Sequence, residues 1–319
     1  MKILRYESNG FAHVGIFSHG LVLDLPTNLD LLEVLNLPRE ERDLLEQQAG
    51  RYYKCPIEQA KLLPPVEPRV VRDFVSFEGH IAGMKKNEPG DGSVPEPWYE
   101  TPVSLMINPY TLKGCGEPVA VPPLTQAMDY ELEVAVILRK PAVDLTAEEA
   151  EDVIAGYAIL NDWSARDIQS REMLVGLGPS KGKDFATSLG PWITTPDELE
   201  QYREGNRYSL PMSVSVNGVE MGSYNLKYMS WSFAELISHS SRGSYVGAGD
   251  VLASGTAHGG SLAEQWAATK QRVTPAPLKA GDVVSMTVEG LGTLWNPIVP
   301  TVSPGHTIPR ATRTVSEGH

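Results

Sequence analysis

Cysteine is nearly absent from this chain. The 319 residues include only Cys55 and Cys115, which are far from a CxxC spacing. Two distant thiols build neither the disulfide framework of a small secreted domain nor the paired thiolates of a structural zinc site. We therefore expect both cysteines to be reduced and structural.

Positive charge and long apolar runs are also scarce. Lys and Arg total 27 against 40 Asp and Glu, so the net charge at pH 7 is -13. Such an acidic chain is a poor partner for phosphate backbones and anionic lipid, which argues against nucleic-acid and membrane binding. No run approaches the roughly 18 apolar residues of a membrane span, and the N-terminus lacks the apolar core of a signal peptide. The sequence predicts a soluble, unexported, cytoplasmic protein.

Short apolar segments and turn residues make up most of the chain. Residues 1–25 alternate short apolar stretches with Asn-Gly and His-Gly breaks, which predicts a β-meander. Residues 30–35 and 39–48 show helical spacing, and a Leu-Leu-Pro-Pro stretch closes this region at residue 65. Beyond it, short β runs alternate with Pro- and Gly-containing loops. We expect a mostly β, α+β protein with a small β-rich N-terminal domain over residues 1–65 and a larger domain over residues 66–319.

Two carboxylates interrupt a run that is otherwise suited to a buried strand. Glu131 and Glu133 stand two residues apart before an apolar stretch that continues to Leu138. On a strand they share one face. Removing ionised carboxylates from water costs several kcal/mol unless a cation compensates them, so a metal ion between them is one interpretation. The alternative is an edge strand that turns both glutamates to water.

Further polar residues stand where functional sites are commonly built. Asp162 ends a predicted buried strand, and Lys183 lies in a Gly-containing loop that lets the backbone approach a ligand closely. Four more candidates are Asp73, His80, Thr256 and Glu264. Taken singly, each has an ordinary explanation as a turn cap, a solvated charge or a hydrogen-bonded core residue.

The order of these segments resembles the fumarylacetoacetate hydrolase family over residues 73–292. The segments that carry the resemblance are Tyr-Glu-Leu-Glu at 130–133, Asn-Asp-Trp-Ser-Ala-Arg-Asp-Ile-Gln at 161–169, Gly-Lys-Asp-Phe at 182–185, residues 223–229, and Gly-Asp-Val-Leu-Ala-Ser-Gly-Thr at 249–256. The resemblance implies a catalytic domain with a mixed β-sandwich or β-roll fold behind a small β-rich N-terminal domain. It also implies a homodimer.

The resemblance implies a metal site made only of carboxylates. Its ligands would be Asp73, Glu131, Glu133 and Asp162. Hard oxygen ligands suit Mg²⁺, our first choice, or Mn²⁺ or Ca²⁺, and argue against zinc. Lys183 and Arg166 would offset the remaining negative charge.

The resemblance further implies an enzyme that hydrolyses a C–C bond in a β-diketo acid such as an acylpyruvate or fumarylacetoacetate. His80 would be the general base, oriented by Glu264, although Glu78 is a competing partner for the histidine. Lys183 would stabilise developing oxyanion charge. The substrate-contacting positions would be Arg166, Gln169 and Thr256, together with Val75 and Met173.

Two of these positions depart from the family pattern. Fumarylacetoacetases have tyrosines where this chain has Val75 and Met173. An arginine expected shortly after His80 has no clear equivalent, and only Lys85 and Lys86 lie nearby. The loss of these groups puts fumarylacetoacetate itself in doubt.

Two other functions stay open. The first is a metal-dependent β-keto acid decarboxylase, dehydratase or isomerase on the same scaffold. The second is a binding protein that keeps the scaffold without catalysis.

Overall fold

A large mixed sheet organises the molecule. The computed structural model describes residues 1–52, 54–86, 93–269, 274–303 and 305–312. Within them, a 12-stranded sheet has the order β4-β3-β2-β1-β15-β13-β11-β21-β6-β7, with β5 paired to β1 and β8 to β15. Its strands are β1 (Lys2–Ser8), β2 (Phe11–Ser18), β3 (Leu21–Asp24), β4 (Lys54–Pro56), β5 (Lys61–Leu63), β6 (Val71–Phe74), β7 (Ser104–Ile107), β8 (Leu112–Lys113), β11 (Leu132–Leu138), β13 (Ile154–Asp162), β15 (Thr187–Thr194) and β21 (Val251–Ala253).

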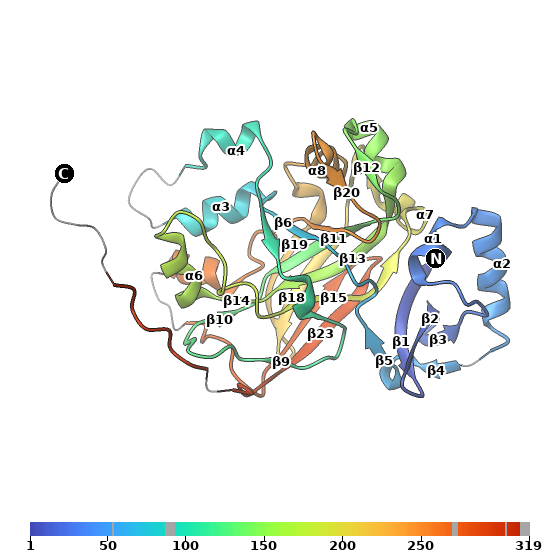
Figure 1. Cartoon of the computed structure of the whole chain (residues 1–319), viewed down its shortest axis with the longest axis horizontal. Coiled ribbons are helices and arrows are strands. Elements are labelled where there is room, and N and C mark those ends of the chain that lie inside the picture. The colour runs from blue at the N-terminus through green and yellow to red at the C-terminus, as the bar shows by residue number, and fades with distance from the viewer. Residues whose placement is uncertain (53, 87–92, 270–273, 304, 313–319) are drawn as a thin grey trace.

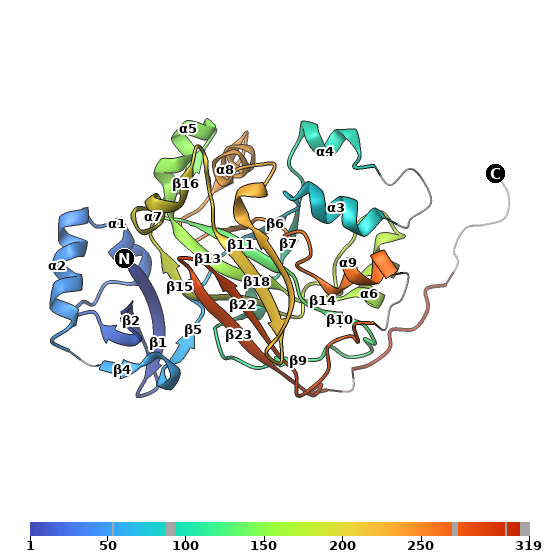
Figure 2. The ribbon, with the colours of Figure 1, turned by 180° about the vertical axis from the view of Figure 1, so that it is seen from behind.

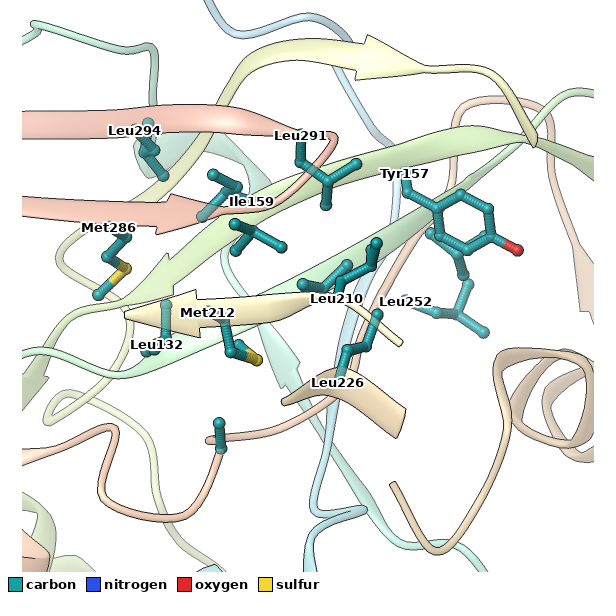
Figure 3. Close-up of a cluster of buried hydrophobic side chains, with 14 of the residues drawn as sticks. Leu132, Tyr157, Ile159, Leu210, Met212, Leu226, Leu252, Met286, Leu291 and Leu294 are labelled. Atoms are coloured by element: carbon teal, nitrogen blue, oxygen red, sulfur yellow. The ribbon is translucent and has the colours of Figure 1, made fainter. Parts of the chain in front are cut away.

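A second sheet covers one face of the first. Its order is β19-β18-β22-β23-β9. The strands are β9 (Val119–Ala120), β18 (Pro211–Val216), β19 (Val219–Asn225), β22 (Val283–Val288) and β23 (Gly292–Val299). Figure 3 shows Ile159 of the first sheet among Met212, Met286 and Leu294 of the second, in one buried cluster. The expected sandwich of two sheets is therefore confirmed.

Helices lie around the sheets, and α3, α4, α6 and α9 lie together at one end (Figure 1 and Figure 2). Figure 1 shows α3, α4 and α6 at the end opposite the N-terminal elements, and Figure 2 shows α9 beside α6. The helices are α1 (Leu31–Asn36), α2 (Arg39–Ala49), α3 (Glu78–Lys85), α4 (Glu96–Glu100), α5 (Ala147–Ala150), α6 (Arg166–Met173), α7 (Pro196–Leu199), α8 (Phe233–Ser241) and α9 (Leu262–Thr269). Three short strand pairs complete the fold: β10 (Met128–Asp129) with β14 (Ser164–Ala165), β12 (Ala142–Val143) with β20 (Tyr245–Val246), and β16 (Arg203–Glu204) with β17 (Arg207–Tyr208). None of the helices in the described ranges is long and apolar enough to cross a membrane.

The N-terminal region forms the predicted meander and helices. Strands β1, β2 and β3 pair in sequence, and α1 begins at a capping box in which Asp30 and Glu33 each bond the other's backbone N–H. Strand β1 also pairs with β15, so the meander extends the main sheet. The domain boundary at residue 65 stays a prediction.

The strand after Glu131 lies in the centre of the sheet. Strand β11 pairs with β13 on one side and β21 on the other, and all seven of its residues are buried. Val134 and Val136 pack into the core between the two sheets, whereas Ala135 and Ile137 pack into a second core on the opposite face. The wet edge strand considered for the two glutamates is therefore wrong. A central strand differs from an edge strand in having a partner on both sides. The partners of β11, which are β13 and β21, come from other segments of the chain.

Candidate metal centre and active site

Four carboxylates lie on one face of the main sheet, at neighbouring strand ends. Asp73 is in β6, Glu131 directly precedes β11, Glu133 is in β11, and Asp162 is the last residue of β13. The register aligns Asp73 with Ala253 of β21, and that alanine with Ala135. Because side chains alternate along a strand, Glu131 and Glu133 share the face of Ala135, away from the second sheet.

The cluster formed by these four carboxylates is buried and compact. Each of its residues is at most 5% exposed. Oxygen atoms of Asp73, Glu131 and Glu133 all lie within 4.8 Å of one another. The Lys183 ammonium group, which is also buried, hydrogen bonds both Glu131 and Asp162 and so ties the fourth carboxylate to the other three.

The carboxylate cluster carries more negative charge than its neighbouring cations balance. Burial, reinforced by the neighbouring carboxylates, raises the pKa of Glu133 and Asp162 well above the usual range, although Lys183 opposes the rise at Asp162. Burial also raises the pKa of Asp73 to about 6, with Lys183 opposing it. At Glu131 the effect of burial is outweighed by Arg166 and Lys183, so its pKa is lowered. Glu131 is therefore the one carboxylate of the cluster whose pKa the protein cations lower below its ordinary value.

The cluster fits a divalent metal ion. Oδ1 of Asp73 and Oδ1 of Asp162 are buried without a hydrogen-bond partner. Buried acceptors without a donor are rare in folded proteins and cost free energy, and a cation satisfies them. Four carboxylates are the hard oxygen donors that Mg²⁺, Mn²⁺ and Ca²⁺ prefer.

A histidine–glutamate pair lies beside the cluster, at the contact between α3 and α9. His80 Nδ1 is 2.5 Å from Glu264 Oε1, and the backbone N–H of Gly259 donates to both oxygens of Glu264. Gly83 makes room for the carboxylate, because a Cβ at this position would stand 2.6 Å from Glu264 Oε2. The competing partner Glu78 instead accepts from the Tyr99 hydroxyl at 2.8 Å. The structure thus pairs His80 with Glu264, as the resemblance implied.

One cleft of about 890 Å³ joins the cluster to the histidine. Its lining includes Asp73, Glu131, Lys183, His80 and all five predicted substrate-contacting residues, namely Val75, Arg166, Gln169, Met173 and Thr256. The fully buried Glu133 and Asp162 lie behind this surface, and Glu133 accepts a hydrogen bond from the Thr256 hydroxyl at 3.5 Å. The predicted site residues are thus brought together around one space.

Arg166 joins the cluster to a buried carboxylate that the motif reasoning did not single out. Its Nε donates to Asp129 at 2.9 Å, its Nη2 to Glu131 at 2.7 Å and its Nη1 to Gln169 at 3.0 Å. Asp129 also accepts the backbone N–H groups of Leu262 and Ala263, at the start of α9. It therefore connects the helix that carries Glu264 to the metal side of the site. The position of Asp129, two residues before Glu131, could have indicated that it shares the same strand face. Its hydrogen-bond partners, however, are distant in the sequence.

A second residue missed by the motif reasoning is His258. Its Nδ1 lies 2.8 Å from Glu264 Oε2, and its side chain is 49% exposed. The short sequence distance to Glu264 was a weak signal, because only the turn before α9 brings the two side chains together.

Curated relatives of the chain include a tautomerase and a hydrolase. It is 32% identical over 200 residues to the oxaloacetate tautomerase YisK of Bacillus subtilis, a match that covers 62% of each chain. It is 33% identical over 194 residues to a 2,4-didehydro-3-deoxy-L-rhamnonate hydrolase of Sphingomonas, covering 60% of this chain and 63% of the relative. The matched segment thus spans less than two thirds of either relative.

Solved structures extend the likeness to nearly the whole chain. The fumarylacetoacetate hydrolase of Exiguobacterium antarcticum is 27% identical, with a TM-score of 0.71, covering 94% of this chain and 99% of that one. A maleylpyruvate hydrolase of Sphingobium, solved with manganese and pyruvate, has a TM-score of 0.69 at 19% identity and supports the fold alone.

The family model described as fumarylacetoacetate (FAA) hydrolase C-terminal matches residues 69–299, which contain every residue of the carboxylate cluster and the His80–Glu264 pair. This chain belongs to the fumarylacetoacetate hydrolase family.

Proposed function

We propose that this protein is a divalent-metal-dependent hydrolase that cleaves a C–C bond of a β-diketo acid. One observation carries the proposal: the cleft that is lined by Asp73 and Glu131 of the carboxylate cluster is also lined by His80, which a buried carboxylate already holds. C–C hydrolysis needs a deprotonated water, an electrophilic carbonyl and a stabilised carbanion. The requirement for a deprotonated water distinguishes C–C hydrolysis from tautomerisation and decarboxylation, which use no attacking water.

His80 is positioned to take the proton of that water. Its Nδ1 faces Glu264, so Nε2 is the ring nitrogen available to the cleft. Glu264 fixes the ring orientation and stabilises the imidazolium that forms. The water oxygen then bonds to the distal carbonyl carbon. The C–C bond breaks, its electron pair leaves on the oxo-acid fragment as an enolate, and protonation of that enolate gives the second product.

The cations and donors of the cleft hold the substrate oxygens. Lys183 reaches the cleft from between Glu131 and Asp162, where its positive charge stabilises a developing oxyanion. Arg166 orients the Gln169 carboxamide, and Thr256, whose hydroxyl donates to Glu133, also lines the cleft. Asp73, Glu131, Glu133 and Asp162 would hold the ion, with Mg²⁺ as first choice and Mn²⁺ or Ca²⁺ as alternatives. When bound, such an ion supplies Lewis-acid polarisation of a substrate carbonyl.

The direct test compares products. Acylpyruvate, oxaloacetate and fumarylacetoacetate are incubated with the protein and Mg²⁺, and the products are identified by NMR. We expect an acylpyruvate to give two carboxylic acids. With His80→Asn we expect kcat to fall roughly 10²- to 10⁴-fold, while calorimetric Mg²⁺ binding stays unchanged. His306→Asn, at an exposed position, is the matched control. Full activity of His80→Asn would refute the base assignment.

The relatives keep a second function open. The 32% identity to an oxaloacetate tautomerase favours enolate chemistry without water attack as the alternative. In that case oxaloacetate would tautomerise or lose CO₂, and no diketo acid would be cleaved. The same product analysis separates the two functions.

A further inference from the structure

The cleft is lined by both charged and apolar side chains. Near the cluster it presents Asp73, Glu131, Lys183, Arg166 and His80. Its lining also includes many apolar side chains: Val75, Met84, Val103, Met173, Trp266, and Leu105, which is the strand partner of Asp73. The indole N–H of Trp266 donates to the Pro275 carbonyl at 2.7 Å, so that ring offers carbon surface to a ligand.

Helix α6 runs from the charged part of the cleft to the apolar part. Arg166, Gln169, Ser170 and Met173 all line the cleft, and their spacing of three, four and seven residues places them on one helical face. Arg166 bonds Glu131 at the N-terminus of the helix, whereas Met173 is 52% exposed at its other end. A rise of 1.5 Å per residue separates these ends by about 10 Å. Helix α3 repeats the arrangement with His80 and, one turn later, Met84.

The cations that line the described cleft are already bound by protein acids. Arg166 bonds Asp129 and Glu131, and Lys183 bonds Glu131 and Asp162. Lys85 and Lys86 are not among the described residues that line the cleft. Asp167 is in the lining and adds negative charge there.

From this arrangement, and resting on the proposed function, we infer that the substrate is a 2,4-dioxo acid whose far end is an apolar acyl chain. The 2-oxo acid end lies at the cations and the carboxylate cluster. The acyl end lies along the apolar side of α6 and α3, where each buried methylene is stabilised by roughly 0.8 kcal/mol. A second carboxylate at the acyl end would lose its hydration without gaining a cation from the described lining of the cleft.

Binding of simple 2-oxo acids tests the inference without any turnover. With Mg²⁺ present, calorimetry is run on 2-oxobutanoate, 2-oxohexanoate, 2-oxooctanoate and 2-oxoadipate. We expect Kd to fall roughly two- to fourfold per added methylene, and 2-oxoadipate to bind at least about tenfold more weakly than 2-oxohexanoate of equal carbon number. A flat series, or tighter binding of 2-oxoadipate, would overturn the inference.

A matched pair of variants locates the effect on α6. Met173→Lys places a cation at the apolar end of the helix and is expected to reverse the preference between 2-oxohexanoate and 2-oxoadipate. Leu174→Lys makes the same change at a neighbouring residue that is 88% exposed and outside the described cleft lining, so it should keep the wild-type preference. Both positions are exposed, and melting temperatures check that both variants fold. If the two variants behave alike, the acyl end does not lie along α6.

The two proposals fail in different ways. If 2-oxo acids show the chain-length series but no 2,4-dioxo acid is cleaved, the hydrolase assignment is wrong and the apolar site stands. If fumarylpyruvate is cleaved faster than an acylpyruvate with an apolar chain of equal length, the hydrolase stands and the apolar site is wrong.

Discussion

Strands β11 and β13 each have an apolar segment and a charged end, and both parts are equally buried. Val134, Val136 and Ile159 are completely buried, as are Glu133 and Asp162. Figure 3 shows Ile159 within the packed core, three residues before the carboxylate that ends its strand. The same pair of strands therefore carries the best and the worst residues for burial.

This difference separates what stabilises the fold from what the site requires. Apolar burial contributes roughly 25 cal/mol per Å² and drives the strands together. Burial of carboxylates opposes folding unless cations compensate them, and their raised pKa values show that compensation is incomplete. The charged ends thus reduce stability in exchange for metal-binding capacity, a common relation between stability and function. Substitutions in the apolar segments and at the charged ends should therefore change the free energy of unfolding in opposite directions.

The largest effect is expected at Lys183. Lys183→Met removes the cation that contacts Glu131 and Asp162 and should lower the free energy of unfolding by about 4 kcal/mol without metal. Urea unfolding in the presence of EDTA measures this loss of unfolding free energy. Lys181→Met is the control, because its ion pair with Asp184 is exposed and should matter little. Equal stability of the two variants would mean that the buried charges are not coupled.

In the apolar segment of β13, Ile159→Ala should lower the free energy of unfolding by about 3 kcal/mol, because packing is lost and a cavity is left. Calorimetric Mg²⁺ affinity of the folded variant should match that of the wild type. A large loss of affinity would show that the two parts of β13 are not independent.

At the charged end, Glu133→Gln should act in the opposite direction. Without metal it removes a buried charge whose pKa is raised by burial and by three neighbouring acids, and should raise the free energy of unfolding by about 1–2 kcal/mol. Its Mg²⁺ affinity should fall about 100-fold. Glu220→Gln, at an exposed site, should change neither quantity. Destabilisation by Glu133→Gln would contradict the proposed trade-off.

The smallest effect is the pH dependence of Asp73. Its pKa rises from the ordinary 3.8 to about 6 on folding, so the metal-free protein loses stability as pH rises through this interval and the carboxylate ionises. The melting temperature of Asp73→Asn should therefore match that of the wild type near pH 4 and exceed it above pH 7, by roughly 2–4 °C for each kcal/mol of stability that the ionised carboxylate removes. Saturating Mg²⁺ should reverse the difference. If the difference in melting temperature between the variant and the wild type becomes smaller as pH rises, the prediction is wrong.

Much of the fold was readable from local pattern. The meander of residues 1–25, the helices near residues 30 and 39, and the buried strand before Asp162 all form as predicted. Each depends on turn residues, capping residues or periodicity within a few positions. The wet edge strand was a wrong alternative because the same local pattern fits an edge strand and a central one.

The candidate site was recoverable only in part. Motif order brought out the four carboxylates, Lys183, His80 and Glu264. Asp129 and His258 escaped, because their importance lies in contacts with Arg166, α9 and Glu264 that no spacing rule encodes. Likewise, the choice between Glu78 and Glu264 as the partner of His80 depended on which helix packs against α3.

By itself, the sequence determined that Glu131 and Glu133 share a strand face and that this is a fumarylacetoacetate hydrolase family chain. Tertiary structure decided that this face is buried, that Asp73 and Asp162 join it, and that one cleft leads from the cluster to an apolar surface. The physical reason is that side-chain alternation acts over two residues, whereas burial and charge compensation depend on segments that meet only when the sheet assembles.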